Sequence, residues 1–491
     1  MTLGELAARL PGAAPSGDAA VAIAAVTHDS RKAGPGTLFV AVRGTATDGN
    51  QFVDAARKKG AAAVASEEPP RPGGPWLQVP DAREALATLS AEVLGRPADA
   101  LTLVGVTGTN GKTTTTYLID AVLRAAGHKT GLLGTVQYRV GDRLAEASRT
   151  TPESSDLQAL FRQMVDEGCD HAVLEVSSHS LELKRVHGCA FQVAVFTNLT
   201  RDHLDFHGDM ERYFLAKRRL FDTYLRPSGH AVINLDDDRA PELIAASRGR
   251  VWTYAVGGGP ADLQATDVRL SLDATRFRAR TPVGDLDVHT PLLGRFNVQN
   301  VLAALGGTLA LGVDPGAALR GIASVSGVPG RLERVLAGQD FTVVVDYAHT
   351  DDALKNLLET IRELRPRRVI TVFGCGGDRD RTKRPLMGAV AARLSDVVVV
   401  TSDNPRSEPP EAILEEIQRG MNGGRRAERH AIVDRREAIV RALEMAQPGD
   451  AVVIAGKGHE TYQVLRDRTV PFDDRQIARE VLTRLALRGK A

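Results

Sequence analysis

The sequence predicts an α/β protein built from three domains. The chain has 491 residues, short apolar runs alternate with helix-like stretches, and glycine-rich or charged segments follow several of the apolar runs. A chain of this length holds about three domains of roughly 150 residues each. Alternating strands and helices predict parallel strands with crossover helices, and polar segments that follow such strands gather at one edge of the sheet.

The composition is that of a globular protein and gives no sign of nucleic-acid or membrane binding. Hydrophobic residues make up 43% of the chain, charged residues 25%, and the formal net charge is +1, so no basic footprint for a polyanion is present. The first residues show no signal-peptide pattern, and no apolar run is long enough to span a membrane. The three cysteines have no metal-binding spacing. We therefore expect a cytoplasmic monomer that acts on small molecules.

The first domain is predicted to be a small α/β N-terminal domain, residues 1–98. Its strands and helices are expected at residues 21–26, 37–41, 52–59 and 82–94. The proline- and glycine-rich segment 68–75 reads as a surface loop. Gly95, Arg96 and Pro97 mark a linker to the next domain.

The central domain, residues 99–330, is predicted to contain a doubly wound sheet. Its strands are expected at residues 101–106, 171–176, 193–197 and 231–234. Residues 267–288 alternate more loosely, so we expect an antiparallel edge there. A third, Rossmann-like domain, residues 331–491, follows the segment Val328-Pro329-Gly330-Arg331. Its strands are expected at residues 341–346, 368–374, 396–401 and 451–456.

A glycine-rich loop follows the first strand of the central domain, with the sequence Gly108-Thr109-Asn110-Gly111-Lys112-Thr113-Thr114. A strand, a glycine loop and a helix in this order make a phosphate cradle, because backbone amides and the helix N-terminus face the anion. Lys112 is placed to reach the outer phosphates of a nucleotide, and Thr113 to hold Mg²⁺. Val106 stands where the strict P-loop pattern has glycine or alanine. The alternative is a tight turn with one stray lysine, which leaves the agreement of loop, lysine and flanking elements unexplained.

Two polar segments follow the next strands of the central domain. Glu175 ends one strand and is placed to bind a metal ion; the alternative is a carboxylate at an exposed strand edge. Residues 198–208 contain two histidines and two aspartates after a buried strand. Mg²⁺ prefers oxygen ligands and tolerates a single imidazole. Lys217, on the helix expected at residues 211–225, is by itself an ordinary lysine whose position after this cluster is the only hint of a role.

A further helix is predicted to open at Gly294. Asn297 and Asn300 are three residues apart and share one face of it. One of them can cap the helix, or both can recognise the edge of a purine. Both interpretations stay open at this point.

The predicted strands of the C-terminal domain each end in a glycine-rich or charged loop. These four loops are residues 346–349, 374–381, 403–406 and 456–460. We expect them to converge on one pocket. Arg379 and Arg406 can grip a carboxylate with their forked guanidinium groups, and Asp403 and Glu460 can pair with an ammonium group. Such a pocket suits a zwitterionic amino acid.

Taken together, these motifs resemble the Mur ligases over the whole chain. The ATP loop, the Glu175 segment, the histidine cluster, the two asparagines and the segments at residues 329–331 and 346–349 occur in the order seen in that family. Asp29-Ser30-Arg31, Thr150-Thr151-Pro152-Glu153 and Asp403-Asn404-Pro405-Arg406 resemble its MurE-type branch, which adds the third residue of the peptidoglycan stem peptide. The Asn-Pro-Arg form is similar to the branch that adds meso-diaminopimelate.

The resemblance implies an ATP-dependent, ADP-forming ligase that joins meso-diaminopimelate to UDP-N-acetylmuramoyl-L-Ala-D-Glu through an acyl phosphate. It implies that the three domains bind UDP, ATP and the amino acid, in chain order. The implied catalytic residues are Lys112, Lys217 and His203. The implied Mg²⁺ ligands are Thr113, Glu175, His203 and Lys217 after its carbamylation by CO₂. ATP is expected to contact Gly108, Thr109, Asn110, Gly111, Lys112, Thr113, Thr114, Asn297, Asn300, Arg331 and Asp346.

The resemblance also assigns residues to the other two substrates. The UDP-muramoyl dipeptide is expected to contact Ser30, Thr150, Thr151, Ser177 and Arg185. The diaminopimelate pocket is expected to consist of Arg379, Asp403, Asn404, Pro405, Arg406, Gly456 and Glu460. Two positions depart from the family pattern: Leu183 replaces a frequent glutamine, and Asp351 replaces a usual proline. The base that deprotonates the incoming amine stays open, with His203 and His207 as candidates.

Three alternatives accompany this prediction. The same ligase can take L-lysine or L-ornithine, since one or two pocket side chains decide the choice. A folylpolyglutamate-type ligase shares the ATP loop and the acyl-phosphate chemistry, but the first domain and Asn404-Pro405-Arg406 disfavour it. A regulatory protein that only hydrolyses nucleotide is disfavoured because the metal and amino-acid clusters are both present.

Overall fold

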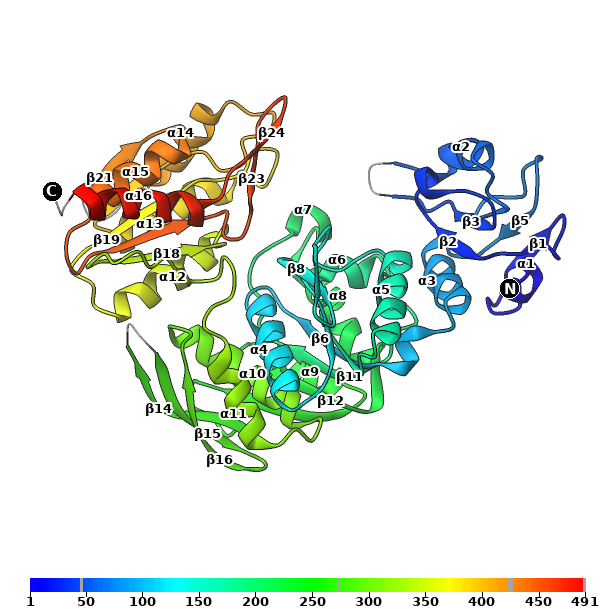
Figure 1. Cartoon of the computed structure of the whole chain (residues 1–491), viewed down its shortest axis with the longest axis horizontal. Coiled ribbons are helices and arrows are strands. Elements are labelled where there is room, and N and C mark those ends of the chain that lie inside the picture. The colour runs from blue at the N-terminus through cyan, green and yellow to red at the C-terminus, as the bar shows by residue number, and fades with distance from the viewer. Residues whose placement is uncertain (45–46, 272–273, 422–426, 489–491) are drawn as a thin grey trace.

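The computed structural model describes residues 1–44, 47–271, 274–421 and 427–488. Figure 1 shows three lobes, with the middle part of the chain lying between the N-terminal and C-terminal lobes. Each lobe is built on its own sheet, and the sheets have five, eleven and six strands among the described residues. Within those residues, no helix combines the length and the apolar character needed to cross a membrane.

The N-terminal lobe carries a five-stranded sheet in the order β1-β5-β4-β3-β2. Its strands are β1 (Ala14–Ser16), β2 (Ala25–Thr27), β3 (Thr37–Val40), β4 (Ala63–Ser66) and β5 (Trp76–Gln78). Its helices are α1 (Leu3–Ala7), η1 (Ser30–Lys32), η2 (Gly49–Phe52), α2 (Val53–Lys58), α3 (Ala82–Val93) and η3 (Pro97–Ala100). The strand expected at residues 21–26 is shorter and shifted, because residues 23 and 24 bond to backbone outside the β2–β3 ladder.

The central sheet has the order β16-β15-β14-β13-β12-β11-β6-β10-β7-β8-β9. Its strands are β6 (Thr102–Thr107), β7 (Thr130–Leu133), β8 (Gln137–Val140), β9 (Arg143–Glu146), β10 (His171–Glu175), β11 (Phe191–Phe196), β12 (Leu225–Asn234), β13 (Arg250–Ala255), β14 (Leu263–Leu270), β15 (Thr275–Thr281) and β16 (Gly284–Thr290). Its helices are α4 (Lys112–Ala125), α5 (Ser154–Asp166), α6 (Ser178–Glu182), α7 (Leu204–His207), α8 (Met210–Asp222), α9 (Ala240–Ala246), α10 (Arg295–Leu309) and α11 (Pro315–Ser324).

The middle of this sheet is parallel and both of its edges are antiparallel. The antiparallel edge predicted from residues 267–288 is confirmed by the pairing of β14, β15 and β16. The opposite edge, β8 and β9, was not predicted, because β9 is exposed along its length and lacks an apolar alternation. The helix predicted to reach residue 225 ends at Asp222, since Leu225 begins β12.

Alternating side chains of β6 explain why both faces of the central sheet are covered. Val104 and Val106 point into a core formed with α4, α10 and α11, and Leu103 points into the core on the other face. Gly105 lies against Phe191, whose ring atoms stand 2.9 Å from the place where a Cβ would be. The strand is therefore fixed between two cores, and the loop that follows it starts from a rigid position.

The C-terminal sheet has the order β17-β18-β22-β19-β20-β21. Its strands are β17 (Glu333–Arg334), β18 (Thr342–Asp346), β19 (Val369–Phe373), β20 (Val397–Val400), β21 (Glu428–Ala431) and β22 (Ala451–Ala455), and a hairpin of β23 (Tyr462–Val464) and β24 (Thr469–Pro471) lies apart. Its helices are α12 (Asp351–Glu363), α13 (Lys383–Leu394), α14 (Pro410–Gly420), α15 (Arg435–Met445) and α16 (Asp474–Arg488).

The four strands predicted for this domain are present, but they are not consecutive in the chain. The polar edge strand β21 comes between β20 and β22 and was missed, because its residues are mostly exposed. In space β18, β22, β19 and β20 are neighbours. Their carboxyl ends therefore lie side by side, as a shared pocket requires.

Candidate functional site

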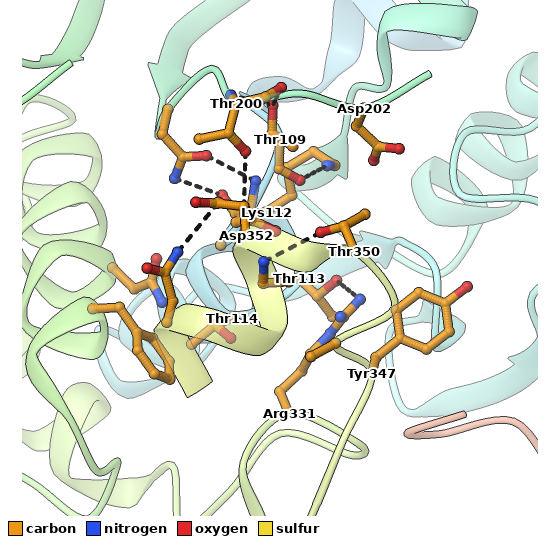
Figure 2. A pocket seen from close by; sticks show the side chains of 18 of the residues that line it. Thr109, Lys112, Thr113, Thr114, Thr200, Asp202, Arg331, Tyr347, Thr350 and Asp352 are labelled. Carbon is orange, nitrogen blue, oxygen red and sulfur yellow. Dashed lines mark hydrogen bonds between the residues drawn. The ribbon is translucent and has the colours of Figure 1, made fainter. Parts of the chain in front are cut away.

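A cavity of about 430 Å³ lies where the central and C-terminal lobes meet. The central lobe contributes the loops after β6, β10 and β11, which are neighbouring strands of its sheet. The C-terminal lobe contributes Arg331, the segment after β18 and the first turns of α12. Figure 2 shows Lys112, Thr113 and Asp202 together with Arg331, Tyr347 and Asp352, and a hydrogen bond joins Arg331 to Thr113. Residues far apart in the chain thus share one polar site.

The loop after β6 is shaped by two glycines. Gly108 (φ 147°) and Gly111 (φ 88°) adopt positive φ angles, and a Cβ on Gly111 would stand 2.4 Å from the Asn300 side-chain oxygen. Gly111 directly precedes α4 and has no side chain to accept hydrogen bonds from the first helical amides. These amides and the helix dipole therefore face the cavity and suit a phosphate group.

Two lysines converge on one carbonyl oxygen of this loop. The Nζ atoms of Lys112 and Lys217 each donate to the Gly108 oxygen at 2.8 Å, and Lys112 also donates to the Thr109 oxygen at 2.9 Å. Lys217 is 1% exposed. Burial, followed by repulsion from Lys112, lowers the pKa of Lys217 well below its ordinary value. A buried lysine beside a second cation is biased towards the neutral amine, which is the nucleophilic form.

The predicted metal ligands Thr113, Glu175 and His203 line the same cavity as Lys217. Glu175 is 1% exposed, and its two oxygens accept hydrogen bonds from the Thr135 amide at 2.8 Å and the Thr135 hydroxyl at 3.1 Å. The Thr113 hydroxyl accepts from Arg331 at 3.3 Å. A buried carboxylate, a hydroxyl and one imidazole form a donor set that suits Mg²⁺.

His203 of this donor set lies in a cluster with two further histidines, His179 and His207, whose rings meet edge to face. The ring of His179 lies 4.8 Å from that of His203 and 5.5 Å from that of His207, centre to centre. Burial lowers the pKa of all three to about 4, and neighbouring positive charges act in the same direction. The rings are therefore neutral at pH 7, which is the form that can bind a metal ion or accept a proton.

We expect these histidines to make the protein less stable as the pH falls from 6.5 towards 4. In this window the unfolded chain protonates histidines at their ordinary pKa of 6.5, whereas the folded chain protonates these three only near 4. The unfolded state then binds more protons, so the free energy of unfolding drops with falling pH. Denaturant unfolding at a series of pH values measures this slope.

The matched variants are His207→Gln and His289→Gln. His207 is 5% exposed and its Nε2 lies 3.0 Å from the Ser178 hydroxyl, whereas His289 is exposed on β16. His207→Gln should flatten the slope between pH 6.5 and 4, and His289→Gln should leave it unchanged. Equal slopes in all three proteins would contradict the expectation.

Four of the residues predicted to bind the muramoyl dipeptide lie together around the end of β10. The Thr151 hydroxyl donates to the Glu175 carbonyl at 2.7 Å and accepts from the Ser177 amide at 3.2 Å. Arg185 donates to the Thr151 carbonyl at 3.2 Å, and the Thr150 hydroxyl lies 3.0 Å from that of Thr135. Ser30 is apart from them, in η1 of the N-terminal lobe. One of the contacts between that lobe and the central one is made by His28, whose Nδ1 lies 3.2 Å from the Ser155 hydroxyl.

The residues predicted on the far side of the nucleotide are only partly in the cavity wall. Asn300, Arg331 and Asp346 line it. Asn297 lies behind Asn300: its side-chain oxygen accepts from Asn300 at 2.9 Å, and its amide donates to the Leu293 carbonyl at 2.8 Å. Asn297 therefore orients Asn300, and its own contact with a nucleotide stays a prediction.

The loops predicted to bind an amino acid do converge in the C-terminal lobe. The Asn404 amide donates to Glu460 at 2.9 Å, and Arg406 donates to the Gly377 carbonyl at 2.8 Å. A Cβ on Gly456 would stand 2.7 Å from an Asp403 oxygen, so these loops touch. Arg379 is exposed and donates only to the neighbouring Asp378 carbonyl among the contacts described.

Sequence reasoning missed two polar side chains of these sites. The Lys457 ammonium, which is fully buried, donates to Glu460 at 2.8 Å and to Asn404 at 3.1 Å. The Tyr213 hydroxyl lies 3.1 Å from that of Thr109, and its ring centre is 4.4 Å from the Lys217 Nζ. Tyr213 precedes Lys217 by four residues and so shares its helix face, which is a signal that the sequence offered.

The two departures from the family pattern have different structural outcomes. Asp351 opens α12 and accepts from Arg201 at 2.7 Å, which links the C-terminal lobe to the loop after β11. An aspartate here thus gains an ion pair that proline cannot form. Leu183 is half-buried at the end of α6, and nothing in the structure explains the replacement of a glutamine there.

Comparison with known proteins assigns all three lobes to one family. The Mur ligase middle domain matches residues 106–307, the glutamate ligase domain of the Mur ligases matches residues 330–458, and the Mur ligase family catalytic domain matches residues 22–93. A UDP-N-acetylmuramoyl-L-alanyl-D-glutamate–2,6-diaminopimelate ligase of Solibacter usitatus is 50% identical, with 98% of each chain covered. The ligase of the same name from Geobacillus thermodenitrificans is 47% identical and covers 98% of this chain and 99% of its own.

Solved structures agree with this assignment. A structure of an enzyme with the same ligase name has a TM-score of 0.71, 36% identity and 99% coverage of both chains. The MurF ligase of Thermotoga maritima in complex with ADP has a TM-score of 0.64 and 20% identity, covering 95% of this chain and 98% of its own. A folylpolyglutamate synthase of Mycobacterium tuberculosis has a TM-score of 0.62 and 21% identity, but covers only 76% of this chain. The last two share the fold.

Proposed function

The chain belongs to the Mur ligase family, and from that premise we propose that it joins meso-diaminopimelate to UDP-N-acetylmuramoyl-L-Ala-D-Glu in an ATP-dependent, ADP-forming reaction of peptidoglycan precursor synthesis. Relatives that carry this ligase name match it along almost its whole length. The observation that carries the proposal is the single cavity that joins the glycine loop, Lys112, Lys217 and Glu175 to residues of the C-terminal lobe.

The chemistry follows from the charges in this cavity. A substrate carboxylate must attack the γ-phosphate of ATP although both are anionic. Lys112, released from the Gly108 and Thr109 carbonyls, is placed to neutralise the transferred phosphoryl group, and the first amides of α4 hold the phosphates. ADP leaves as the acyl phosphate forms. The incoming amine, after loss of a proton to a base, attacks the acyl carbon, and phosphate leaves. Mg²⁺, bound by Thr113, Glu175 and His203, would offset the remaining negative charge of the triphosphate.

We propose that Lys217 is carbamylated by CO₂. A neutral amine is needed to attack CO₂, and the burial of Lys217 beside Lys112 favours that form. Attack of the neutral amine on CO₂ releases one proton and leaves a carbamate anion near the Lys112 ammonium, which shares the Gly108 carbonyl with Lys217. The carbamate gives the cavity another oxygen ligand for a metal ion and attracts the Lys112 cation.

The substrates are assigned to the three lobes in chain order. The N-terminal lobe with Ser30 would hold the uridine end, and Thr150, Thr151, Ser177 and Arg185 would hold the muramoyl dipeptide. The convergent loops of the C-terminal lobe, with Asp403, Asn404, Pro405, Arg406, Gly456 and Glu460, would hold the amino acid, and Arg379 would turn inwards to join them. Three buried free thiols and the use of ATP fit a cytoplasmic enzyme, and we propose that it acts as a monomer.

The decisive experiment offers the purified protein ATP, Mg²⁺ and UDP-N-acetylmuramoyl-L-Ala-D-Glu with diaminopimelate, L-lysine or L-ornithine in turn. We expect a tripeptide product by mass spectrometry with diaminopimelate, and ADP release that requires both the amino acid and the UDP-linked acceptor. A product formed only with lysine or ornithine would show that this amino acid, and not diaminopimelate, is the substrate. Rapid ATP hydrolysis without the acceptor, or ligation of a folate substrate, would refute the proposal.

A further inference from the structure

We propose that Arg435, which lies outside the substrate pocket, is a positioning residue that sets the distance between the two loops that bind the amino acid. This inference rests on the proposed function, since it assigns those loops to amino-acid binding. The first loop, residues 403–406, follows β20, and the second, residues 456–460, follows β22. Arg435 is the first residue of α15.

The guanidinium group of Arg435 contacts the residue that directly precedes each of the two loops. It donates to the Ser402 carbonyl at 3.2 Å and to the Ala455 carbonyl at 3.0 Å. These are the residues directly before Asp403 and Gly456. The remaining donors go to the Asp474 carboxylate at 2.8 and 2.7 Å in a forked pair, and both side chains are fully buried.

The sheet order explains why such a bridge matters. β20 and β22 are not neighbours, because β19 lies between them. No backbone ladder joins β20 to β22 directly, so the spacing of the two loops is set through β19 and by the side chains that contact both loops. Arg435 bridges Ser402 and Ala455, and Asp474, the first residue of α16, fixes the guanidinium group in place.

On the pocket side the same loops depend on close contacts. Asn404 donates to Glu460 at 2.9 Å, and Lys457 bonds to both of these residues. A small shift of one loop would break this network and displace the groups that are assigned to the amino acid. Misplacement by about 1 Å of groups that hold a substrate can cost about 100-fold in activity.

The contribution of the Arg435–Asp474 ion pair to stability does not by itself explain why these two residues are buried here. Taking two charges out of water costs several kcal/mol per ion, and apolar side chains of similar volume often replace a buried ion pair without loss. The fork of Arg435 supplies what an apolar side chain cannot: donors in a rigid plane, aimed at a carboxylate and at two carbonyls.

The test compares Arg435→Lys with Arg368→Lys. Lysine keeps the charge beside Asp474 but cannot reach both carbonyls at once. Arg368 makes the matching interaction at the opposite end of the same sheet: it donates to the buried Asp450 at 2.6 Å and to the Met445 carbonyl at 2.9 Å. For Arg435→Lys we expect the KM for the amino acid to rise about 10- to 100-fold, with the KM values for ATP and for the UDP-linked acceptor unchanged. Arg368→Lys should leave all three KM values unchanged.

Thermal unfolding and ADP binding establish that each variant is folded, and Asp474→Asn replaces Arg435→Lys if the latter does not fold. The same selective rise in the KM for the amino acid is expected for it. A folded Arg435→Lys or Asp474→Asn protein with a wild-type KM for the amino acid overturns the inference. A wild-type protein that ligates no amino acid overturns the proposed function instead, so the two failures are distinguishable.

Discussion

Lys112→Ala is expected to abolish ligation while leaving the fold intact. Among the described residues, the hydrogen bonds of the ammonium group go to the Gly108 and Thr109 carbonyls of its own loop, so its removal breaks no hydrogen bond between distant elements. In the reaction it is the cation placed to meet the transferred phosphoryl group. Loss of one such electrostatic group typically lowers kcat by about 100- to 1,000-fold. Product formation at saturating substrate concentrations measures this loss.

Lys129→Ala is the matched control for this prediction. Lys129 directly precedes β7 in the same sheet, at the end opposite to the carboxyl ends of the strands that carry the site, and its Nζ contacts the Glu167 carbonyl. Its removal should leave kcat at the wild-type value. Substantial ligation by Lys112→Ala would refute the role of the glycine loop in phosphoryl transfer.

Lys217→Ala is expected to cause a loss of similar size, about 100-fold or more, and its rescue distinguishes two roles of the side chain. Lys217 is 1% exposed and lies against the Tyr213 ring, so truncation leaves a space inside the protein. If the working form is a carbamate, acetate should restore part of the activity, because it returns a carboxylate to that space. If the working form is the amine, methylamine should do so.

Carbamylation of Lys217 can also be measured directly on the wild-type protein. Labelled bicarbonate should give a carbamate signal in nuclear magnetic resonance spectra that is absent from Lys217→Ala. Depletion of CO₂ should lower wild-type ligation and leave the variant unchanged. Rescue by methylamine alone, together with no labelled carbamate, would disprove the carbamylation.

Much of the fold could be predicted because apolar runs of the parallel strands are unmistakable. β6, β10, β11, β18, β19, β20 and β22 are buried almost throughout, and strands of this kind read as continuous runs of valine, leucine and isoleucine. Edge strands carry a weaker signal. β9 and β21 are mostly exposed and polar, so nothing in their composition separated them from loops.

The site residues also divide into those that a local sequence pattern reveals and those that it does not. Glu175 and Lys112 could be found because each stands directly at the end of a buried strand or its loop. Lys457 and Arg435 could not be assigned, because their roles depend on which loops the sheet order brings together. That order places β22 between β18 and β19, and a local pattern contains no information about such an insertion.

The place of β22 also has a consequence for how the chain is made. Residues 451–455 form an interior strand of the C-terminal sheet, pairing with β18 on one side and β19 on the other. On the ribosome, the first two sheets are complete well before this strand is synthesised, whereas β18 and β19 must wait for it with apolar edges unpaired. The C-terminal sheet is therefore completed only when the chain has been made almost to its end, although most of its strands are made earlier.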